Sequence, residues 1–262
     1  ATDLYLETLQ MTDPRRVPKQ LPNSSEKLIV ALDVDSADVA RGLVADLSDV
    51  VGTFKLGLQL FSAAGGSFVR ELVESGSRVF LDLKFHDIPN TVSRAGIEAA
   101  RLGVWMFNVH ASGGSEMMKR TVGDVGEFCS KSNLAMPRII GVTVLTSSNQ
   151  DTLREIGVEG TVDEQVARLA LLTAESGLHG VVASPNEVKV IRKVVSDPKF
   201  LIVTPGIRPL SATNDDQKRV MTPDEAISQG ATYLVIGRPI VAAPDPRGEA
   251  MRIIEEINSV LQ

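Results

Sequence analysis

The chain has 262 residues, of which 43% are hydrophobic, and a formal net charge of -6 from 27 Lys and Arg against 33 Asp and Glu. This length and apolar content suit one large α/β domain or two small ones, and an acidic balance without a basic run argues against a nucleic-acid partner. The single Cys excludes an intrachain disulfide, and the three His are too scattered for zinc-ligand spacing.

The N-terminal region carries neither of the apolar signals that direct a chain to a membrane. No apolar stretch approaches the roughly 20 residues that span a bilayer, and no charged segment followed by an apolar run resembles a secretory signal. We therefore expect a cytoplasmic protein without a membrane partner. Residues 1–26 contain three Pro and scattered charges, so we predict a short N-terminal extension, followed by one domain over residues 27–262.

Short β-branched runs recur along the chain at intervals that suit a strand followed by a helix. They cover residues 28–34, 53–56, 78–84, 106–111, 138–145, 180–183, 200–204 and 233–236. The segments between them have apolar residues at helical spacing. In the segment 36–47, Ser36 is expected to cap a helix whose apolar face consists of Val39, Leu43, Val44 and Leu47. Eight βα units in about 235 residues predict a single (β/α)8 TIM barrel, whereas a doubly wound sheet more often has five or six strands.

The third run ends in the sequence DLKFHDIPNT, residues 82–91. Residues two apart in a strand share a face, so Asp82 and Lys84 point the same way. Burial of an unpaired ion costs several kcal/mol, so these charges must neutralise one another or line a wet cavity. A solvated edge strand with a structural ion pair is the simpler alternative.

Polar residues end most of the eight runs. In a TIM barrel the active site lies at the C-terminal ends of the strands, and the residues at or just after those ends include Asp33, Lys55, Asp82, Lys84, His110, Thr146, Ser147, Arg208 and Arg238. A barrel built for stability alone has no need of so many charges at one end. The pattern favours a catalytic or binding site.

The seventh and eighth runs end in TPGIR, residues 204–208, and IGRP, residues 236–239. Gly lets backbone N–H groups approach an anion, Arg grips it with two parallel hydrogen bonds, and these strand ends commonly bind phosphate. Surface arginines beside ordinary turns are the alternative. The long polar segment 209–223 is predicted to be a lid, in which Gln217 is expected to donate its amide to the phosphate.

Together these motifs closely resemble the orotidine 5′-phosphate decarboxylase family. The matching segments are ALD (31–33), FKLG (54–57), DLKFHDIPNT (82–91), VHA (109–111), VLTS (144–147), TPGIR (204–208), Gln217 and IGRP (236–239). The ten-residue motif is highly specific, and only the first 26 residues have no counterpart. The resemblance implies decarboxylation of orotidine 5′-monophosphate to uridine 5′-monophosphate in pyrimidine biosynthesis, without a metal or cofactor.

The resemblance also implies which residues act. A catalytic tetrad of Lys55, Asp82, Lys84 and Asp87 is expected, in which Lys84 stabilises and protonates a carbanion at C6 of the pyrimidine. Asp87 would reach the partner's site in a homodimer with shared active sites. The other implied substrate contacts are Asp33 and Thr91 at the ribose, Thr146 and Ser147 at the pyrimidine, Arg208, Gln217, Gly237 and Arg238 at the phosphate, and Ile88 and His110 in the pocket.

Three alternatives remain at this stage. Magnesium-dependent sugar-phosphate decarboxylases and synthases of related barrels share an Asp-x-Lys-x-x-Asp core, although residues 88–91, 146–147 and Gln217 favour a pyrimidine nucleotide. A Schiff-base aldolase is less favoured because carboxylates beside a lysine keep it charged and poorly nucleophilic. A phosphate-binding barrel without catalysis would differ from both by its lack of turnover.

Overall fold

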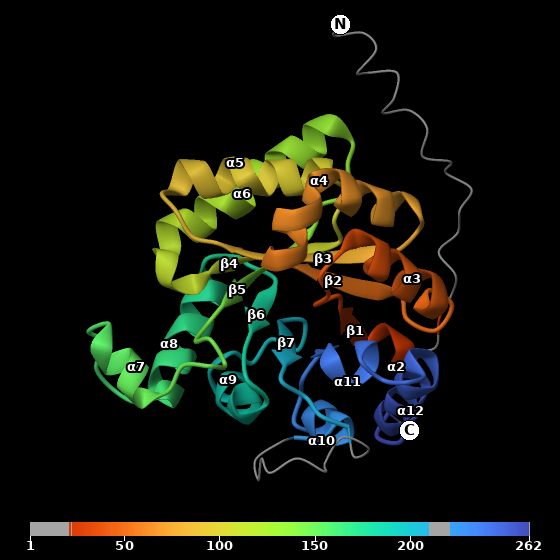
Figure 1. Cartoon of the computed structure of the whole chain (residues 1–262). Coiled ribbons are helices and arrows are strands. Elements are labelled where there is room, and N and C mark those ends of the chain that lie inside the picture. Colours follow the sequence, from red (N-terminus) through yellow and green to blue (C-terminus); the bar gives the residue numbers. More distant parts are fainter. Residues whose placement is uncertain (1–20, 22, 210–220, 262) are drawn as a thin grey trace, which may run out of the picture.

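The computed structural model describes residues 21, 23–209 and 221–261 and places eight parallel strands in a closed barrel (Figure 1). The strands are β1 (Leu28–Ala31), β2 (Thr53–Gly57), β3 (Arg78–Phe85), β4 (Met106–His110), β5 (Arg138–Val142), β6 (Gly180–Val182), β7 (Leu201–Pro205) and β8 (Tyr233–Ile236). Each strand pairs with the next, and β8 pairs with β1. The predicted (β/α)8 barrel is confirmed, with every predicted run forming its strand.

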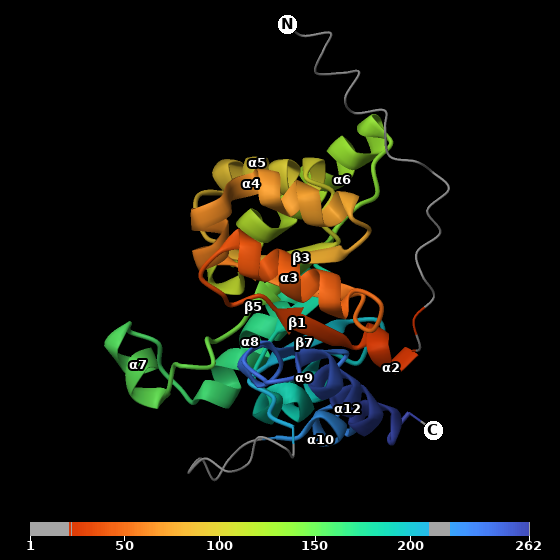
Figure 2. The same cartoon turned by 45° about the vertical axis from the view of Figure 1, so that its right-hand side comes forward.

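Helices cover the outside of the barrel (Figures 1 and 2). They are α2 (Asn23–Glu26), α3 (Ala37–Leu47), α4 (Leu58–Glu74), α5 (Pro89–Arg101), α6 (Gly114–Ser132), α7 (Gln150–Glu155), α8 (Val162–Glu175), α9 (Val188–Val194), α10 (Pro223–Ser228), α11 (Arg238–Val241) and α12 (Pro246–Asn258), with 3-10 turns η2 (Ala111–Gly113) and η3 (Pro185–Glu187). Both views show α7 extending away from the barrel. The segment that joins β5 to α8 therefore protrudes from the barrel.

Helix α3 begins as the sequence predicts, but one residue of its expected buried face is exposed. The Ser36 hydroxyl accepts a hydrogen bond from Val39 N at 3.3 Å. The buried side chains are Ala40, Val44 and Leu47, which follow the i, i+4, i+7 spacing of one helical stripe. Val39 lies about 100° around the helix from Ala40 and is 53% exposed, so its predicted burial is wrong.

An apolar ring fills the interior of the barrel. Its buried members are Ile29, Ala31, Phe80, Met106, Ile140, Val203 and Val235. Strand residues two apart share a face, so the next inward positions toward the strand ends are Asp33, Asp82, Asn108, Val142, Pro205 and Gly237. Above the hydrocarbon floor, β1, β3 and β4 therefore present polar side chains, whereas the other strand ends present Val142, Pro205 and Gly237.

The proposed division of the chain at residue 26 stays a prediction, because residues 1–20 and 22 lie outside the described residues. Helix α2, which ends at that boundary, contacts β1 and α12. Among the described residues, no helix combines the length and hydropathy needed to cross a membrane.

Candidate active site

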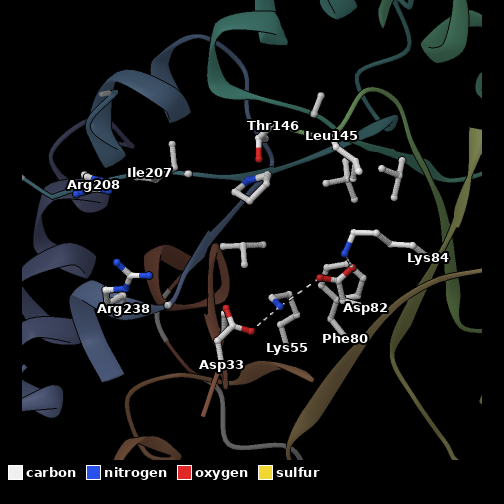
Figure 3. Close-up of a pocket in the computed structure, with 18 of the residues that line it drawn as sticks. Asp33, Lys55, Phe80, Asp82, Lys84, Leu145, Thr146, Ile207, Arg208 and Arg238 are labelled. Atoms are coloured by element: carbon white, nitrogen blue, oxygen red, sulfur yellow. Dashed lines mark hydrogen bonds and ion pairs between the residues drawn. The ribbon is translucent and has the colours of Figure 1, made fainter. Parts of the chain in front are cut away.

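A cavity of about 560 Å³ opens at the C-terminal end of the barrel (Figure 3). Its lining includes Asp33, Lys55, Asp82, Lys84, Thr146, Arg208, Gly237 and Arg238, with an apolar wall formed by Phe80, Val142, Val144, Leu145, Val182, Ile207 and Val235 among others. This volume is within the roughly 300–1,000 Å³ of small-molecule sites. The structure thus brings eight of the residues predicted for the site to one cavity.

The strand register directs Lys55 into the barrel. It pairs with Ala31 on one side and Phe80 on the other, and both belong to the interior ring. Its Nζ lies 3.1 Å from Asp33 Oδ1 and 3.2 Å from Asp82 Oδ2. Burial alone lowers the pKa of Lys55, but attraction to Asp82 and Asp33 outweighs it, so the pKa is raised. Lys55 is consequently a fixed cation at neutral pH.

Asp82 lies between two ammonium groups. Its Oδ1 is 2.7 Å from Lys84 Nζ, and its side chain is only 13% exposed. Burial raises the pKa of Asp82, but Lys55, Lys84 and a hydrogen bond from Asn108 together lower it below its ordinary value. The carboxylate is therefore ionised at neutral pH, and the row Asp33, Lys55, Asp82, Lys84 alternates in charge. The Lys84 side chain remains 35% exposed at the end of that row.

Asn108, which is fully buried in β4, is a site residue that the sequence patterns did not predict. Its Nδ2 donates to Asp82 Oδ1 at 2.7 Å, and its Oδ1 accepts from the backbone N of Lys84 at 2.8 Å. A signal was present, because this amide stands in the apolar run MFNV, two residues after the inward-facing Met106. A polar residue at a fully buried inward position requires hydrogen-bond partners.

The opposite side of the cavity carries the two Gly-Arg pairs. In Figure 3, Arg208 and Arg238 lie on one side, and Asp82 and Lys84 lie on the other. Gly206 has φ 79°, a left-handed conformation that favours Gly. At Gly237, which follows β8, an added Cβ would lie 3.2 Å from Ala31 Cβ and 3.3 Å from Asp33 Oδ2, so a side chain there would crowd the end of β1. These features suit the binding of an anion beside the arginines.

The two ends of the expected lid lie close together, as shown by a hydrogen bond of 3.3 Å from Arg208 N to Met221 O. Residues 210–220, including Gln217, lie outside the described residues, so its phosphate contact stays a prediction.

Five other predicted residues do not line the cavity. Ser147 follows Thr146 in the turn after β5. His110 ends β4, and its ring lies beside that of His86, with 5.3 Å between the two ring centres. Burial first, and then the charges of His86 and Lys84, lower the pKa of His110, so it is mainly neutral at pH 7.

Asp87, Ile88 and Thr91 lie in the exposed segment between β3 and the first turn of α5. Asp87 Oδ1 accepts a hydrogen bond from Ile88 N at 2.6 Å, and the Ile88 side chain is 67% exposed. The cavity of the single chain therefore contains three members of the predicted tetrad and lacks Asp87.

The cavity combines an ammonium at the end of a charge-balanced row with an anion-binding side. Such an ammonium can stabilise negative charge that develops on a bound ligand and can also donate a proton. Among the described residues, no group of three or more His, Cys, Asp or Glu is arranged to hold a metal ion.

Comparison with known proteins agrees with this geometry. The family model described as "Orotidine 5'-phosphate decarboxylase / HUMPS family" matches residues 26–253. The orotidine 5′-phosphate decarboxylase of Syntrophotalea carbinolica is 52% identical over 242 residues, which are 92% of this chain and 99% of that protein. The Moorella thermoacetica protein of the same name is 53% identical over 239 residues, covering 91% of this chain and 94% of its own.

A solved structure gives the same result. The crystal structure of orotidine 5′-phosphate decarboxylase from Lactobacillus acidophilus is 38% identical, with a TM-score of 0.78, and the match covers 89% of this chain and 99% of that one. The sequence resemblance, the barrel and these matches agree, and the chain belongs to the orotidine 5′-phosphate decarboxylase / HUMPS family.

Proposed function

We propose that this protein decarboxylates orotidine 5′-monophosphate to uridine 5′-monophosphate and serves pyrimidine biosynthesis. The observation that carries this proposal is the row Asp33, Lys55, Asp82, Lys84 facing the same cavity as Arg208 and Arg238. Curated relatives that share about half of its residues bear the name of this carboxy-lyase. The combination provides charge for the reaction at one side and a site for the phosphate at the other.

Lys84 has the main chemical role in this proposal. Loss of CO2 from C6 leaves a carbanion in the plane of the pyrimidine, where no carbonyl group can delocalise it. An ammonium about 4 Å away stabilises such a charge by roughly 4 kcal/mol at an effective dielectric constant of about 20. Because Asp82 holds Lys84 Nζ at 2.7 Å, the ammonium is oriented before the reaction begins. It then donates the proton that completes the product.

The other charged groups support that lysine. Asp82 would lie near the departing carboxylate, and their repulsion would disappear as neutral CO2 forms, although we assign this effect the smaller share. Lys55 neutralises Asp82, with Asp33 as its second partner, and Asp87 of a partner chain would help to orient Lys84. Asp33 also contacts the ribose in this proposal.

The remaining predicted residues position the nucleotide. Thr146 and Ser147 would meet the amide edge of the pyrimidine, Thr91 the ribose, and Arg208, Gly237, Arg238 and Gln217 the phosphate, with Ile88 and His110 as further contacts. The phosphate is remote from the bond that breaks, so its binding energy can be used to organise the site around C6.

A homodimer with shared sites would complete the tetrad. Asp87 is absent from the cavity of its own chain, and it stands on an exposed segment beside an exposed apolar side chain, Ile88. An exposed apolar side chain beside an exposed charge is what a contact with a second copy would cover. This supports assignment of Asp87 to the neighbouring site.

The proposed activity predicts loss of the ultraviolet absorbance of orotidine 5′-monophosphate when purified protein is added. We expect the same rate with and without EDTA, because the alternating Lys and Asp side chains leave no all-carboxylate cage for magnesium. Activity that disappears with EDTA and returns with magnesium would support a sugar-phosphate decarboxylase or aldolase of the related barrels. Absence of turnover under both conditions would contradict the proposal.

Lys84→Ala should abolish nearly all turnover while uridine 5′-monophosphate still binds, because the ammonium acts mainly on charge that forms in the transition state. Binding is measured by calorimetry and turnover by absorbance. Lys131→Ala, which removes a 73% exposed lysine on α6, is the matched control and should leave both unchanged. Equal losses in binding and turnover would identify Lys84 as an ordinary substrate contact.

Arg238→Ala should raise KM first, because it removes a charge-assisted contact worth about 1.5–3 kcal/mol. A further fall in kcat is expected if phosphate binding organises the site. In the parent protein, free phosphite should partly restore turnover of a substrate that lacks its phosphate, and it should do so less well in the variant. Arg101→Ala on α5 is the control, and lack of activation by phosphite in the parent would refute the coupling.

Mixing Asp87→Ala and Lys84→Ala proteins tests the shared site. Each variant alone should be inactive, but a heterodimer would contain one site with both lesions and one site with neither, so activity should reappear. Light scattering and exchange of differently tagged subunits would establish that mixed dimers form. A mixture that exchanges subunits and stays inactive would assign Asp87 to its own chain.

A further inference from the structure

Strand β3 contains an irregularity where Lys84 lies. Its pairing with β4 advances from Leu81 to Phe85, which is four residues, while β4 advances only from Phe107 to Val109, which is two. Residues 82–84 therefore stand opposite the single residue Asn108. Such a bulge interrupts the ladder of backbone hydrogen bonds and redirects the side chains that it carries.

The side chain of Asn108 replaces the missing ladder bond. Its Oδ1 accepts from the backbone N of Lys84 at 2.8 Å, a donor that would otherwise lack its strand partner. Lys84 has φ 51°, a left-handed conformation that residues with a side chain rarely adopt. The hydrogen bond from its N–H to the buried amide therefore helps to hold this unfavourable backbone in place.

The other end of the same amide fixes the carboxylate. Asn108 Nδ2 donates a hydrogen bond to Asp82 Oδ1 at 2.7 Å. The same oxygen also accepts a hydrogen bond from Lys84 Nζ at 2.7 Å. One planar amide thus spans the backbone of Lys84 and the group that orients its ammonium. The orientation of the amide follows from the chemistry, because a backbone N–H needs an acceptor and a carboxylate needs a donor.

We propose that Asn108 is the positioning residue of this site: it sets the backbone of Lys84 and the carboxylate of Asp82, and thereby the location of the Lys84 ammonium. This inference rests on the proposed decarboxylation. Asn108 does not line the cavity, so it acts through its two partners and not on the substrate. Its removal should therefore affect kcat much more than KM.

The first test is Asn108→Leu, which has a similar size and suits the apolar barrel interior. We expect kcat to fall about 100-fold, the order that a 1 Å misplacement of reacting groups can cause, while KM changes less than about threefold. Thr53→Val is the matched control, because Thr53 is also fully buried, two residues before the inward-facing Lys55, and its Oγ1 has no hydrogen-bond partner in the described structure. Its kcat should equal that of the parent.

The second test, Asn108→Asp, gives a readout that a purely structural role would not give. When protonated, the new carboxyl can donate to Asp82 and accept from the Lys84 N–H, as the amide does. When ionised, it loses the donor and adds a charge beside Asp82, which raises the pKa of the new group. The ratio of variant to parent kcat should therefore rise as pH falls, whereas the ratio for Asn108→Leu should stay constant.

Circular dichroism and the melting temperature at each pH restrict the comparison to folded protein. An active parent with Asn108→Leu within threefold of its kcat would overturn the inference while leaving the decarboxylase intact, and an inactive parent would instead refute the proposed function. If Asn108→Leu does not fold, the pH dependence of Asn108→Asp decides: a flat ratio in folded protein overturns the positioning role, and a ratio that rises toward low pH supports it.

Discussion

The site depends on one buried carboxylate held between two ammonium groups. Removing an ion from water costs several kcal/mol, and Asp82 is stable in the barrel because Lys55 and Lys84 both contact it. The dependence is mutual, since Lys55 is only 11% exposed and keeps its charge through Asp82 and Asp33. Lys55 and Asp82 are the two members that are little exposed, and breaking a buried pair by removing one partner typically costs about 3–5 kcal/mol. The row is therefore one electrostatic unit.

The barrel supplies the precision that this unit needs. Asp33, Lys55 and Asp82 follow or belong to three adjacent strands, and the register fixes their relative heights. Close-packed side chains below them, such as Phe80 and Met106, form a rigid floor beneath these charges. A preorganised field of this kind need not reorient while the reaction proceeds. Stability of the core and strength of the site thus have the same structural origin.

The sequence predicted the strands, their order and the charges at their ends, because each of these follows from local patterns and from the common direction of parallel strands. Strand alternation predicted that Asp82 and Lys84 lie together, and they do, although a bulge interrupts that alternation between them. The bulge, the left-handed backbone of Lys84 and the role of Asn108 were not predicted, because they arise from the pairing of β3 with β4, which no local pattern specifies. Periodicity also placed Val39 on the wrong face, because the edge of the buried stripe of α3 is set by its packing on the barrel. Asp87 cannot be placed in a site from one chain alone.

Closure of the barrel joins its first strand to its last. Leu28 of β1 pairs with Leu234 of β8, and these residues are 234 − 28 = 206 positions apart in the sequence. During synthesis the first strand therefore has an unpaired edge until nearly the whole chain has been made, and so does β7. Such edges are able to pair with other chains. Because residues after β1 and after β8 both line the cavity, the site is complete only once the last strand has been added.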